Sequence, residues 1–583
     1  MKLRYLLLLG LLPACTSPAT TTRTAAPTAD ARFDRFKNNL LLDLWRLNPD
    51  FALSQGFHKY DSLLVVPDAS QRAREAAFVA TKERALTGFA PDSLSAGNQT
   101  DYRILKNELT AQRWRADTLH EWQWNPATYN VGATAGDLLN GRHYPLARRL
   151  RHISGRLALA PAYYAAARAN LDNPTPEHTQ LGIEQNEGGL AVLGAALADS
   201  VRKSSLSGSE QTLLTQRVTG ARAAIAGYVS YLRRDVLAAG RARRSFRIGR
   251  ALFDRKFALE IQSGYSAGQV FGLAQRHKRD LLLDMSRRAR RLWPRYRAGQ
   301  PLPADTLVLI RQVIDELTLK HPSRAGFMAA IKAQIPVLSR FVDAHQLLTQ
   351  DPSKPLVVRE TPLYMRGSGA GASVSAPGPY DKAADTYYNV EPLPAAWSAA
   401  RAESYLREYN DYTLQILNIH EAIPGHYTQL VYANRSPSLV KSVFGNGAMI
   451  EGWAVFSEKL LLDAGYGNNS DELWLLWDKW NLRSTLNAIA DQLIQTQGAS
   501  EADIVALLTR EGFQEEAEAR GKWHRATLSQ VQLSSYFTGY SEITALRDEI
   551  RRREGAKFSI KQFNEQFLSY GSAPVPYIAR LMR

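Results

Sequence analysis

The sequence predicts a mainly α-helical protein that carries one small β element. Apolar residues recur at three- and four-residue steps through most of the chain, which is the pattern of amphipathic helices. The stretch after Asp351 differs, because short β-branched and aromatic runs are separated there by Gly and Pro. With 45% hydrophobic and 22% charged residues over 583 positions, the composition is that of a globular chain with a large buried core.

The first residues have the pattern of a bacterial export signal. Two basic residues precede an apolar run over residues 6–12, which is too short to span a bilayer. The next residues, Leu12-Pro13-Ala14-Cys15, resemble a lipobox, and Cys15 is the only cysteine in the chain. We expect residues 1–14 to be a lipoprotein signal peptide and residues 15–30 to be a flexible tether behind a lipidated Cys15. The alternative is a plain signal peptide with an incidental cysteine.

The expected export changes which partners the net charge of +16 indicates. A cytosolic protein with this charge would be a candidate for binding nucleic acid, but we expect no nucleic-acid partner for an exported protein. Basic residues cluster at positions 233–256 and 276–297, where Leu and Trp are interleaved at helical spacing. These clusters are typical of the solvated faces of amphipathic helices. The predicted location is the periplasm or the outer-membrane face, with a lipid anchor in the membrane.

The region 31–350 is expected to be helical throughout. Its first helix ends at Asn48-Pro49, where proline stops the pattern. The apolar positions of that helix are Phe33, Phe36, Leu40, Leu44 and Leu47. Further helical patterns cover residues 158–171, 188–201, 213–239, 267–292 and 306–319. We expect their apolar stripes to pack in the core.

The region 351–583 is expected to contain the β element, more helices and the chemistry. Short strands are predicted at residues 356–360, 363–365 and 386–390, and Pro362 suits an edge position. Residues 367–378, which are mostly Gly, Ala, Ser and Pro, predict a mobile loop. Helices are predicted at residues 398–409, 412–432, 447–464, 472–497, 502–510, 514–530 and 534–553. We expect residues 31–583 to form one integrated body.

A candidate zinc motif lies in the helix over residues 412–432. His420 and Glu421 are adjacent and His426 follows, in a chain with only 11 histidines. Zinc hydrolysis requires imidazole ligands and a nearby carboxylate that is not a ligand. In the common pattern the second His follows at the fourth position, whereas His426 follows at the sixth, about 240° around a straight helix. Because Pro424 cannot donate to the carbonyl of His420 and Gly425 tolerates unusual dihedrals, we expect an interruption that returns His426 to the metal.

The third zinc ligand is expected from the apolar helix over residues 447–464. Glu451 and Glu458 are seven residues apart and therefore on one face of this helix. Carboxylates are costly to bury without a partner, so this face indicates a cation opposite it. We expect Glu451 to be a ligand and Glu458 to orient a ligand imidazole. The alternative is that both acids pair with Arg or Lys elsewhere.

Two motifs together resemble a known family. The sequence from His420 to His426, followed by Glu451-Gly452-Trp453-Ala454, resembles the bacterial domain of unknown function 885 (DUF885), whose members are predicted zinc metallopeptidases related to the gluzincins. The resemblance covers most of the mature chain, including Tyr536-Phe537-Thr538-Gly539. It implies a helical metallopeptidase body with the zinc site in a deep cleft. We expect the small β element beside this cleft, because it precedes the His-Glu helix and zinc peptidases commonly bind the substrate backbone at such a sheet. It also suggests that the Tyr536 hydroxyl stabilises an oxyanion, with Tyr540 as the substitute and a packed helical tyrosine as the ordinary alternative.

Two positions depart from the family pattern. The family usually has a second His where this chain has Tyr427, and a phenol is an uncommon zinc ligand. It also commonly shows Asp-x-x-x-His where this chain has Asp491 followed by Gln495, which cannot act as an acid or a cation.

The functional hypothesis is an exported, lipid-anchored zinc metallopeptidase that acts on peptides. Zinc would be held by His420, His426 and Glu451, with Glu421 as the general base and Tyr536 at the oxyanion. One alternative is a non-catalytic helical surface lipoprotein that binds nutrients or envelope polymers, which Tyr427 and Gln495 would favour. Another is a hydrolase of non-peptide amides at the same zinc.

Overall fold

The computed structural model describes residues 27–362, 371–381 and 385–583. The expected signal peptide, Cys15 and the predicted strand at residues 363–365 lie outside the described residues. Helix α1 begins at Ala29, where Thr28 caps it by accepting a hydrogen bond from the backbone of Ala31. The expected tether, residues 15–30, therefore overlaps the start of the first helix.

The described chain is helical from Ala29 to Ala344. The α-helices of this part are α1 (Ala29–Leu47), α2 (Pro49–Ser54), α3 (Ala69–Thr87), α4 (Ala96–Trp114), α5 (Glu121–Trp124), α6 (Val131–Asn140), α7 (Leu146–Leu157), α8 (Ala160–Asn170), α9 (Pro176–Val192), α10 (Ala195–Arg202), α11 (Gly208–Tyr231), α12 (Gly249–Glu260), α13 (Ala267–Tyr296), α14 (Thr306–Leu317) and α15 (Phe327–Ala344). The helix predicted at residues 188–201 is wrong, because α9 and α10 meet there. The chain turns at Gly194, where a Cβ would lie 2.9 Å from the backbone oxygen of Ala191.

The second part of the chain contains a small sheet and the remaining helices. These elements are β1 (Leu356–Glu360), β2 (Ala372–Ser375), β3 (Thr386–Val390), α16 (Ala399–Glu408), α17 (Asp411–Glu421), α18 (His426–Ala433), α19 (Leu439–Val443), α20 (Gly447–Asp463), α21 (Asp471–Gln497), α22 (Glu501–Ala506), α23 (Glu516–Leu528), α24 (Ser535–Glu554), α25 (Ile560–Ser569) and α26 (Val575–Met582). The prediction of a mainly α fold with a small β element is confirmed.

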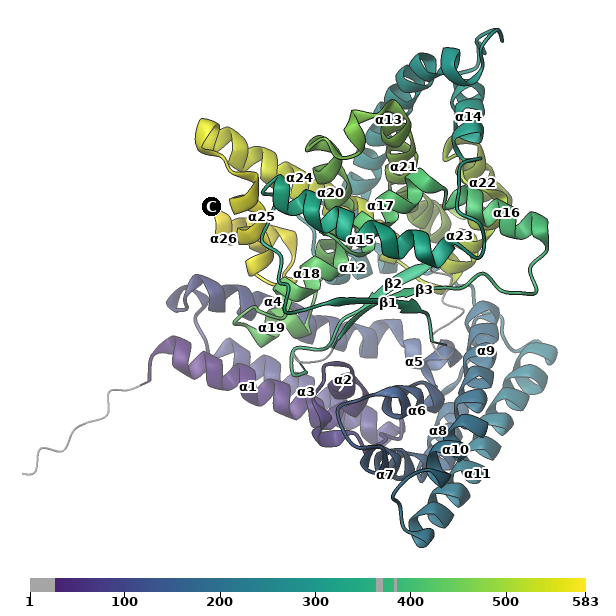
Figure 1. Cartoon of the computed structure of the whole chain (residues 1–583). Helices are drawn as coiled ribbons and strands as arrows, with labels where there is room; N and C mark the ends of the chain where they lie inside the picture. The colour runs from purple at the N-terminus through teal and green to yellow at the C-terminus, as the bar shows by residue number, and fades with distance from the viewer. Residues whose placement is uncertain (1–26, 363–370, 382–384) are drawn as a thin grey trace, which may run out of the picture.

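The sheet has the strand order β1-β3-β2. Leu356 of β1 pairs in parallel with Thr386 of β3, and Ala372 of β2 pairs antiparallel with Val390. Strand β2 corrects the prediction of a mobile loop over residues 367–378. Its sequence, Ala-Ser-Val-Ser, has a single β-branched residue and gives little β signal, and the strand forms because it pairs with the buried strand β3. In Figure 1 the sheet lies between two groups of helices, with α1 to α3 and α6 to α11 on one side and α13 to α15, α17, α20 and α21 on the other.

Buried apolar side chains form two cores. One contains residues between positions 129 and 236, together with Leu64, and holds helices α6 to α11 together. The other combines positions 33–109 with positions 246–582. Helices α1 to α4 thus pack with the second part of the chain, although they are remote from it in sequence.

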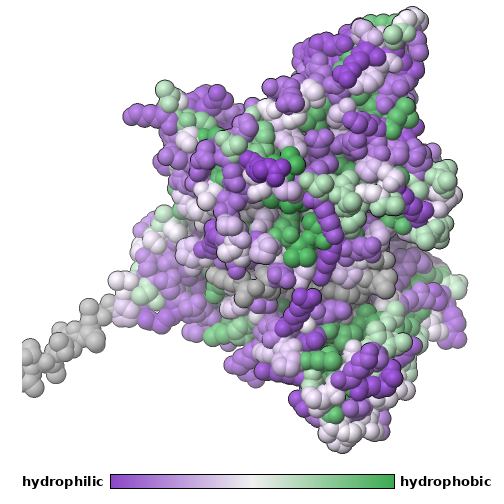
Figure 2. Space-filling view, viewed as in Figure 1, coloured by the Kyte–Doolittle hydropathy of each residue, from purple (hydrophilic) through white to green (hydrophobic). Residues whose placement is uncertain are grey.

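The surface is mainly polar. On the face shown in Figure 2, hydrophilic side chains cover most of the molecule and hydrophobic ones form separate small areas. None of the helices in the described part of the chain has the length and apolar character needed to cross a membrane.

Candidate metal centre

The helix that carries His420 stops at Glu421, and a new helix starts at His426. Four residues form a tight turn between them, with a cis peptide bond before Pro424. The expected interruption is therefore a complete break. Only glycine fits position 425, because a Cβ there would lie 1.8 Å from the backbone oxygen of His420.

Helix α20 packs against this turn and forms a hydrogen bond with it. The indole Nε1 of Trp453 donates to the carbonyl oxygen of Pro424 at 2.9 Å, within a buried environment. The backbone N–H of Gly425 donates to the carbonyl of Ile419 at 3.0 Å, which keeps α18 close to the end of α17. The two sequence motifs are thus in direct contact, and the turn brings His426 to the same side as His420.

Three predicted ligand side chains converge at this break. The Nε2 atoms of His420 and His426 lie 3.8 and 3.4 Å from the same carboxylate oxygen, Oε2 of Glu451. The two imidazole rings are nearly perpendicular, at 87°, with centroids 4.8 Å apart. The side chains of His420, His426 and Glu451 are 8%, 12% and 20% exposed, so the cluster is largely buried and is most open to solvent at Glu451.

Glu458 lies behind His420. Its Oε1 is 2.7 Å from Nδ1 of His420 and accepts a hydrogen bond from Nε1 of Trp480 at 3.0 Å. The carboxylate of Glu458 is fully buried. A proton on Nδ1 of His420 would be held by this carboxylate, which leaves Nε2 directed at Glu451.

The carboxylates control the protonation of His420 in the metal-free protein. Burial alone would lower the pKa of His420, but the nearby Glu451 carboxylate and the hydrogen bond to Glu458 outweigh it and raise this pKa to about 10. Burial opposes ionisation of Glu451, yet the neighbouring imidazoles of His420 and His426 hold its pKa well below the usual range. Burial raises the pKa of Glu458. The His420–Glu458 pair therefore holds at least one proton near neutral pH.

Glu421 lies at the same centre. One ligand atom from each of His420, Glu421 and His426 falls within 4.8 Å of the others. The central strand of the sheet borders this group, because the Tyr388 hydroxyl donates to Oδ1 of Asn418 at 2.9 Å. Burial and then the Glu421 carboxylate raise the pKa of Tyr388. The β element is thus adjacent to α17 at the candidate centre.

Tyr536 is positioned by a close crossing of α20 and α24. A Cβ on Gly452 would lie 2.3 Å from the backbone carbon of Gly539, and one on Gly539 would lie 1.7 Å from the backbone oxygen of Ala448. Two glycines, one from each motif, therefore allow the two helix backbones to touch. Glu451 precedes one of these glycines, and Tyr536 lies one helical turn before the other.

The surroundings of the two candidate tyrosines differ. Burial and the nearby Glu451 carboxylate raise the pKa of the Tyr536 hydroxyl. Its oxygen accepts a hydrogen bond from Nη2 of Arg525 at 3.0 Å. The ring of Tyr540 is buried against His277. Burial, and then the Asp463 carboxylate, raise the pKa of the Tyr540 hydroxyl. Arg525 was not predicted from the sequence, because nothing distinguishes it there from the other basic residues.

The side chains at the two positions that depart from the family pattern, Tyr427 and Gln495, both form hydrogen bonds. The Tyr427 hydroxyl donates to the backbone carbonyl of Lys354, which ties α18 to the segment before β1. The buried Gln495 side chain accepts from the backbone N–H of Ile248 at 3.2 Å and donates to the carbonyl of Ala526 at 3.0 Å. Both side chains hold neighbouring segments together.

Comparison with known proteins identifies relatives of unknown function. Residues 49–582 match the model of a family described as "Bacterial protein of unknown function (DUF885)". A solved structure of a candidate lipoprotein of unknown function from Shewanella oneidensis is 47% identical, with a TM-score of 0.84 over 94% of this chain and 99% of that one. A candidate lipoprotein from Colwellia psychrerythraea shares the fold at 14% identity, with a TM-score of 0.77 over 95% of this chain and 98% of that one. The chain matches no curated protein sequence.

Proposed function

The chain belongs to DUF885, a family of bacterial proteins of unknown function, and we propose that it is a zinc-dependent hydrolase of peptides. The observation that carries this proposal is the convergence of His420 and His426 on one carboxylate oxygen of Glu451. Glu421 lies beside them as a further carboxylate. This combination of two imidazoles, one ligand carboxylate and one free carboxylate is the set used by gluzincin-type peptidases.

The donor atoms fit a zinc ion. Ligand atoms around tetrahedral zinc are about 3.3 Å apart, given bonds of about 2.0–2.1 Å. The distances of 3.4 and 3.8 Å from the histidine nitrogens to Glu451 are close to this spacing. Glu458 supports the fit, because a carboxylate on the far nitrogen of a ligand histidine fixes its tautomer and raises its basicity.

The chain's own residues have distinct roles in the proposed reaction. When bound, zinc supplies Lewis acidity that polarises an amide carbonyl and lowers the pKa of water to about 7. Glu421 accepts the proton of the attacking water and transfers it to the leaving amine. The neutral Tyr536 hydroxyl donates a hydrogen bond to the carbonyl oxygen as negative charge develops there, a contribution of roughly 3 kcal/mol at comparable sites. Arg525 orients that hydroxyl by donating to its oxygen.

A peptide substrate is favoured by the sheet beside the centre. Among the described strands, β2 pairs with β3 on one side only, which leaves a backbone edge for an extended segment to join. The hydroxyl of Tyr388 on β3 is bonded to Asn418, two residues before His420. A peptide added to the sheet would therefore lie near the candidate zinc site.

We also propose that the protein is exported and lipid-anchored at Cys15. The lipobox-like residues 12–15 support this location, and both solved relatives are described as candidate lipoproteins. The predicted partners are then the membrane, through the anchor, and peptides of the cell envelope.

The test combines metal analysis with hydrolysis of a peptide library followed by mass spectrometry. We expect the purified protein to cleave peptides, and we expect Glu421→Gln to keep its zinc while losing at least about 100-fold in kcat. Removal of zinc with a chelator should abolish cleavage, and added zinc should restore it.

Glu403→Gln is the matched control, because this exposed glutamate of α16 contacts His321 and none of the candidate zinc ligands. It should retain full activity. Unchanged peptide hydrolysis in Glu421→Gln would refute the proposed role of Glu421. A zinc protein that cleaves only non-peptide amides would replace the peptide assignment.

A further inference from the structure

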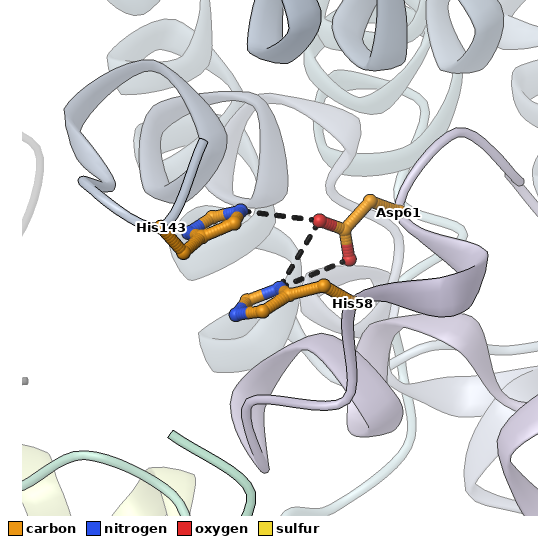
Figure 3. A group of neighbouring side chains, drawn as sticks. All are labelled: His58, Asp61 and His143. Carbon is orange, nitrogen blue, oxygen red and sulfur yellow. Dashed lines mark hydrogen bonds and ion pairs between the residues drawn. The ribbon is translucent and has the colours of Figure 1, made fainter. Parts of the chain in front are cut away.

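A second cluster of histidines lies in the N-terminal part of the chain, apart from the candidate centre. His58 opens the short 3₁₀ helix His58–Tyr60, and Asp61 follows that helix directly. His143 belongs to the connection between α6 and α7, and His152 lies within α7. Figure 3 shows the imidazoles of His58 and His143 lying parallel, with both directed at the carboxylate of Asp61. Three separate segments thus meet at one buried acid.

His58, Asp61 and His143 have the spacing of metal ligands, because one ligand atom of each lies within 4.8 Å of the other two. His152 lies next to Asp61, outside this group. Oδ2 of Asp61 lies 3.1 Å from Nδ1 of His58, 3.2 Å from Nε2 of His143 and 3.6 Å from Nδ1 of His152. Ligand atoms around tetrahedral zinc are about 3.3 Å apart. Asp61 has no exposed side-chain surface, and the three histidine side chains are 11–16% exposed.

Hydrogen bonding alone accounts for only part of this arrangement. His58 and His143 can each donate to Asp61, but Nδ1 of His152 is too far away for a good hydrogen bond and has no partner among the described residues. Nε2 of His58 is likewise buried without a partner there. Neutral imidazoles and a carboxylate are the forms that bind a transition metal.

The surrounding chain fixes the positions of these residues. Arg156, one turn after His152, donates to the backbone carbonyls of Leu63 at 2.6 Å and Asp61 at 3.3 Å. Gly155 allows α7 to approach Ser62, because a Cβ there would lie 2.9 Å from the backbone oxygen of Ser62.

An aromatic ring completes the shell around the cluster. Tyr144 makes edge contacts with His58, His143 and His152, with centroids 4.9–5.8 Å away. The charged group of Arg148 stacks on this ring, 3.6 Å from its centroid. The cluster is thus enclosed by Tyr144 and Arg148.

We propose that His58, Asp61, His143 and His152 form a second site for a divalent transition-metal ion, with Zn²⁺ as the first candidate. Imidazole nitrogens together with one carboxylate are a donor set that Zn²⁺ uses in proteins. The ion would join the segment after α2 to the α6–α7 connection and to α7. This proposal is independent of hydrolysis at His420 and His426.

The test counts Zn²⁺ on the full chain. Purified protein is stripped with a chelator and titrated with Zn²⁺ against a chromogenic indicator. We expect His426→Ala to retain one tight equivalent, and the double variant His426→Ala/Asp61→Asn to lose it. Zn²⁺ should raise the Tm of His426→Ala but not that of the double variant. His345→Ala, which removes an exposed imidazole stacked on Phe341, should keep the zinc content of the wild type.

A second measurement covers the case in which the double variant fails to fold. Co²⁺ bound to folded His426→Ala protein should give the visible absorption of tetrahedral cobalt. Equal zinc content in His426→Ala and in the double variant would overturn the proposal, as would the absence of that cobalt spectrum. If the wild type binds a single equivalent that Asp61→Asn removes and His426→Ala does not, the second site stands and the first fails.

Discussion

Glu458 is the residue that orients His420 toward the other candidate ligands. It is fully buried, it holds Nδ1 of His420 at 2.7 Å, and Trp480 fixes it in turn. This leaves Nε2 of His420 as the atom that faces Glu451 and His426. The orientation of the candidate ligand therefore depends on an acid that does not itself face the other ligands.

We predict that Glu458→Gln weakens zinc binding by about 10- to 100-fold without unfolding the protein, because the neutral amide no longer raises the basicity of His420. Competition with a zinc indicator measures this change. Glu542→Gln is the control, because Glu542 is also a buried glutamate but accepts from Ser263 and Gly264. Equal zinc affinities for Glu458→Gln and the wild type would show that the carboxylate does not support the ligand.

At the scale of elements, the crossing of α20 and α24 sets the distance between Glu451 and Tyr536. The crossing is close, because Gly452 and Gly539 place backbone against backbone. Any side chain at either position would separate the helices and shift Tyr536 relative to Glu451.

We predict that Gly539→Ala destabilises the protein by about 1–3 kcal/mol or more, the usual cost of overpacking, because its Cβ would overlap the backbone oxygen of Ala448. Urea unfolding measures this loss. Gly521→Ala in α23 is the matched control, because its Cβ would meet no atom within 4 Å. It should stabilise the helix by roughly 0.5–1 kcal/mol. Similar stabilities for the two variants would contradict the tight crossing.

Local sequence signals predicted some elements well and left others out. The strands at Leu356–Glu360 and Thr386–Val390 have β-branched or aromatic residues, and the break after Glu421 follows from Pro424 and Gly425. Strand β2 has only one such residue, Val374, and it forms through its pairing with β3.

The second histidine cluster was missed for a similar reason. The only local signal is His58 three residues before Asp61, whereas His143 is 82 residues away from that acid. Contacts between remote segments decide such clusters, and hydrophobic periodicity does not report them.

At the scale of the whole molecule, long-range packing joins helices that are far apart in the sequence. Helices α1 to α4 share a core with the helices that carry the candidate centre, whereas α6 to α11 form their own core around positions 129–236. The proposed second metal site joins the segment after α2 to α7 and to the connection before it. Phe57 and Tyr60 of that segment pack on the larger core, so the ion would link the two cores.

The stability of the whole molecule should also depend on pH through Asp491. This buried acid of α21 accepts hydrogen bonds from the backbones of Val531 and Ser534, before α24. Burial outweighs these bonds and a weaker effect of Lys256, and it raises the pKa of Asp491 to about 6. The unfolded chain has the ordinary value of about 3.9, so between these values the folded state binds the extra proton. The contribution of Asp491 to the free energy of unfolding is therefore present at low pH and is lost as pH rises through about 6.

We predict that the difference in unfolding free energy between the wild type and Asp491→Asn changes with pH. Asparagine cannot ionise, so lowering the pH from 8 to 5 should favour the wild type by about 1 kcal/mol relative to the variant. The asparagine also replaces the carboxylate as hydrogen-bond acceptor, which changes the unfolding free energy of the variant by an amount that does not vary with pH. Urea unfolding at both pH values measures the two differences, and all other titrating groups cancel in the comparison. A difference that stays constant from pH 8 to 5 would mean that Asp491 ionises equally in the folded and unfolded chains.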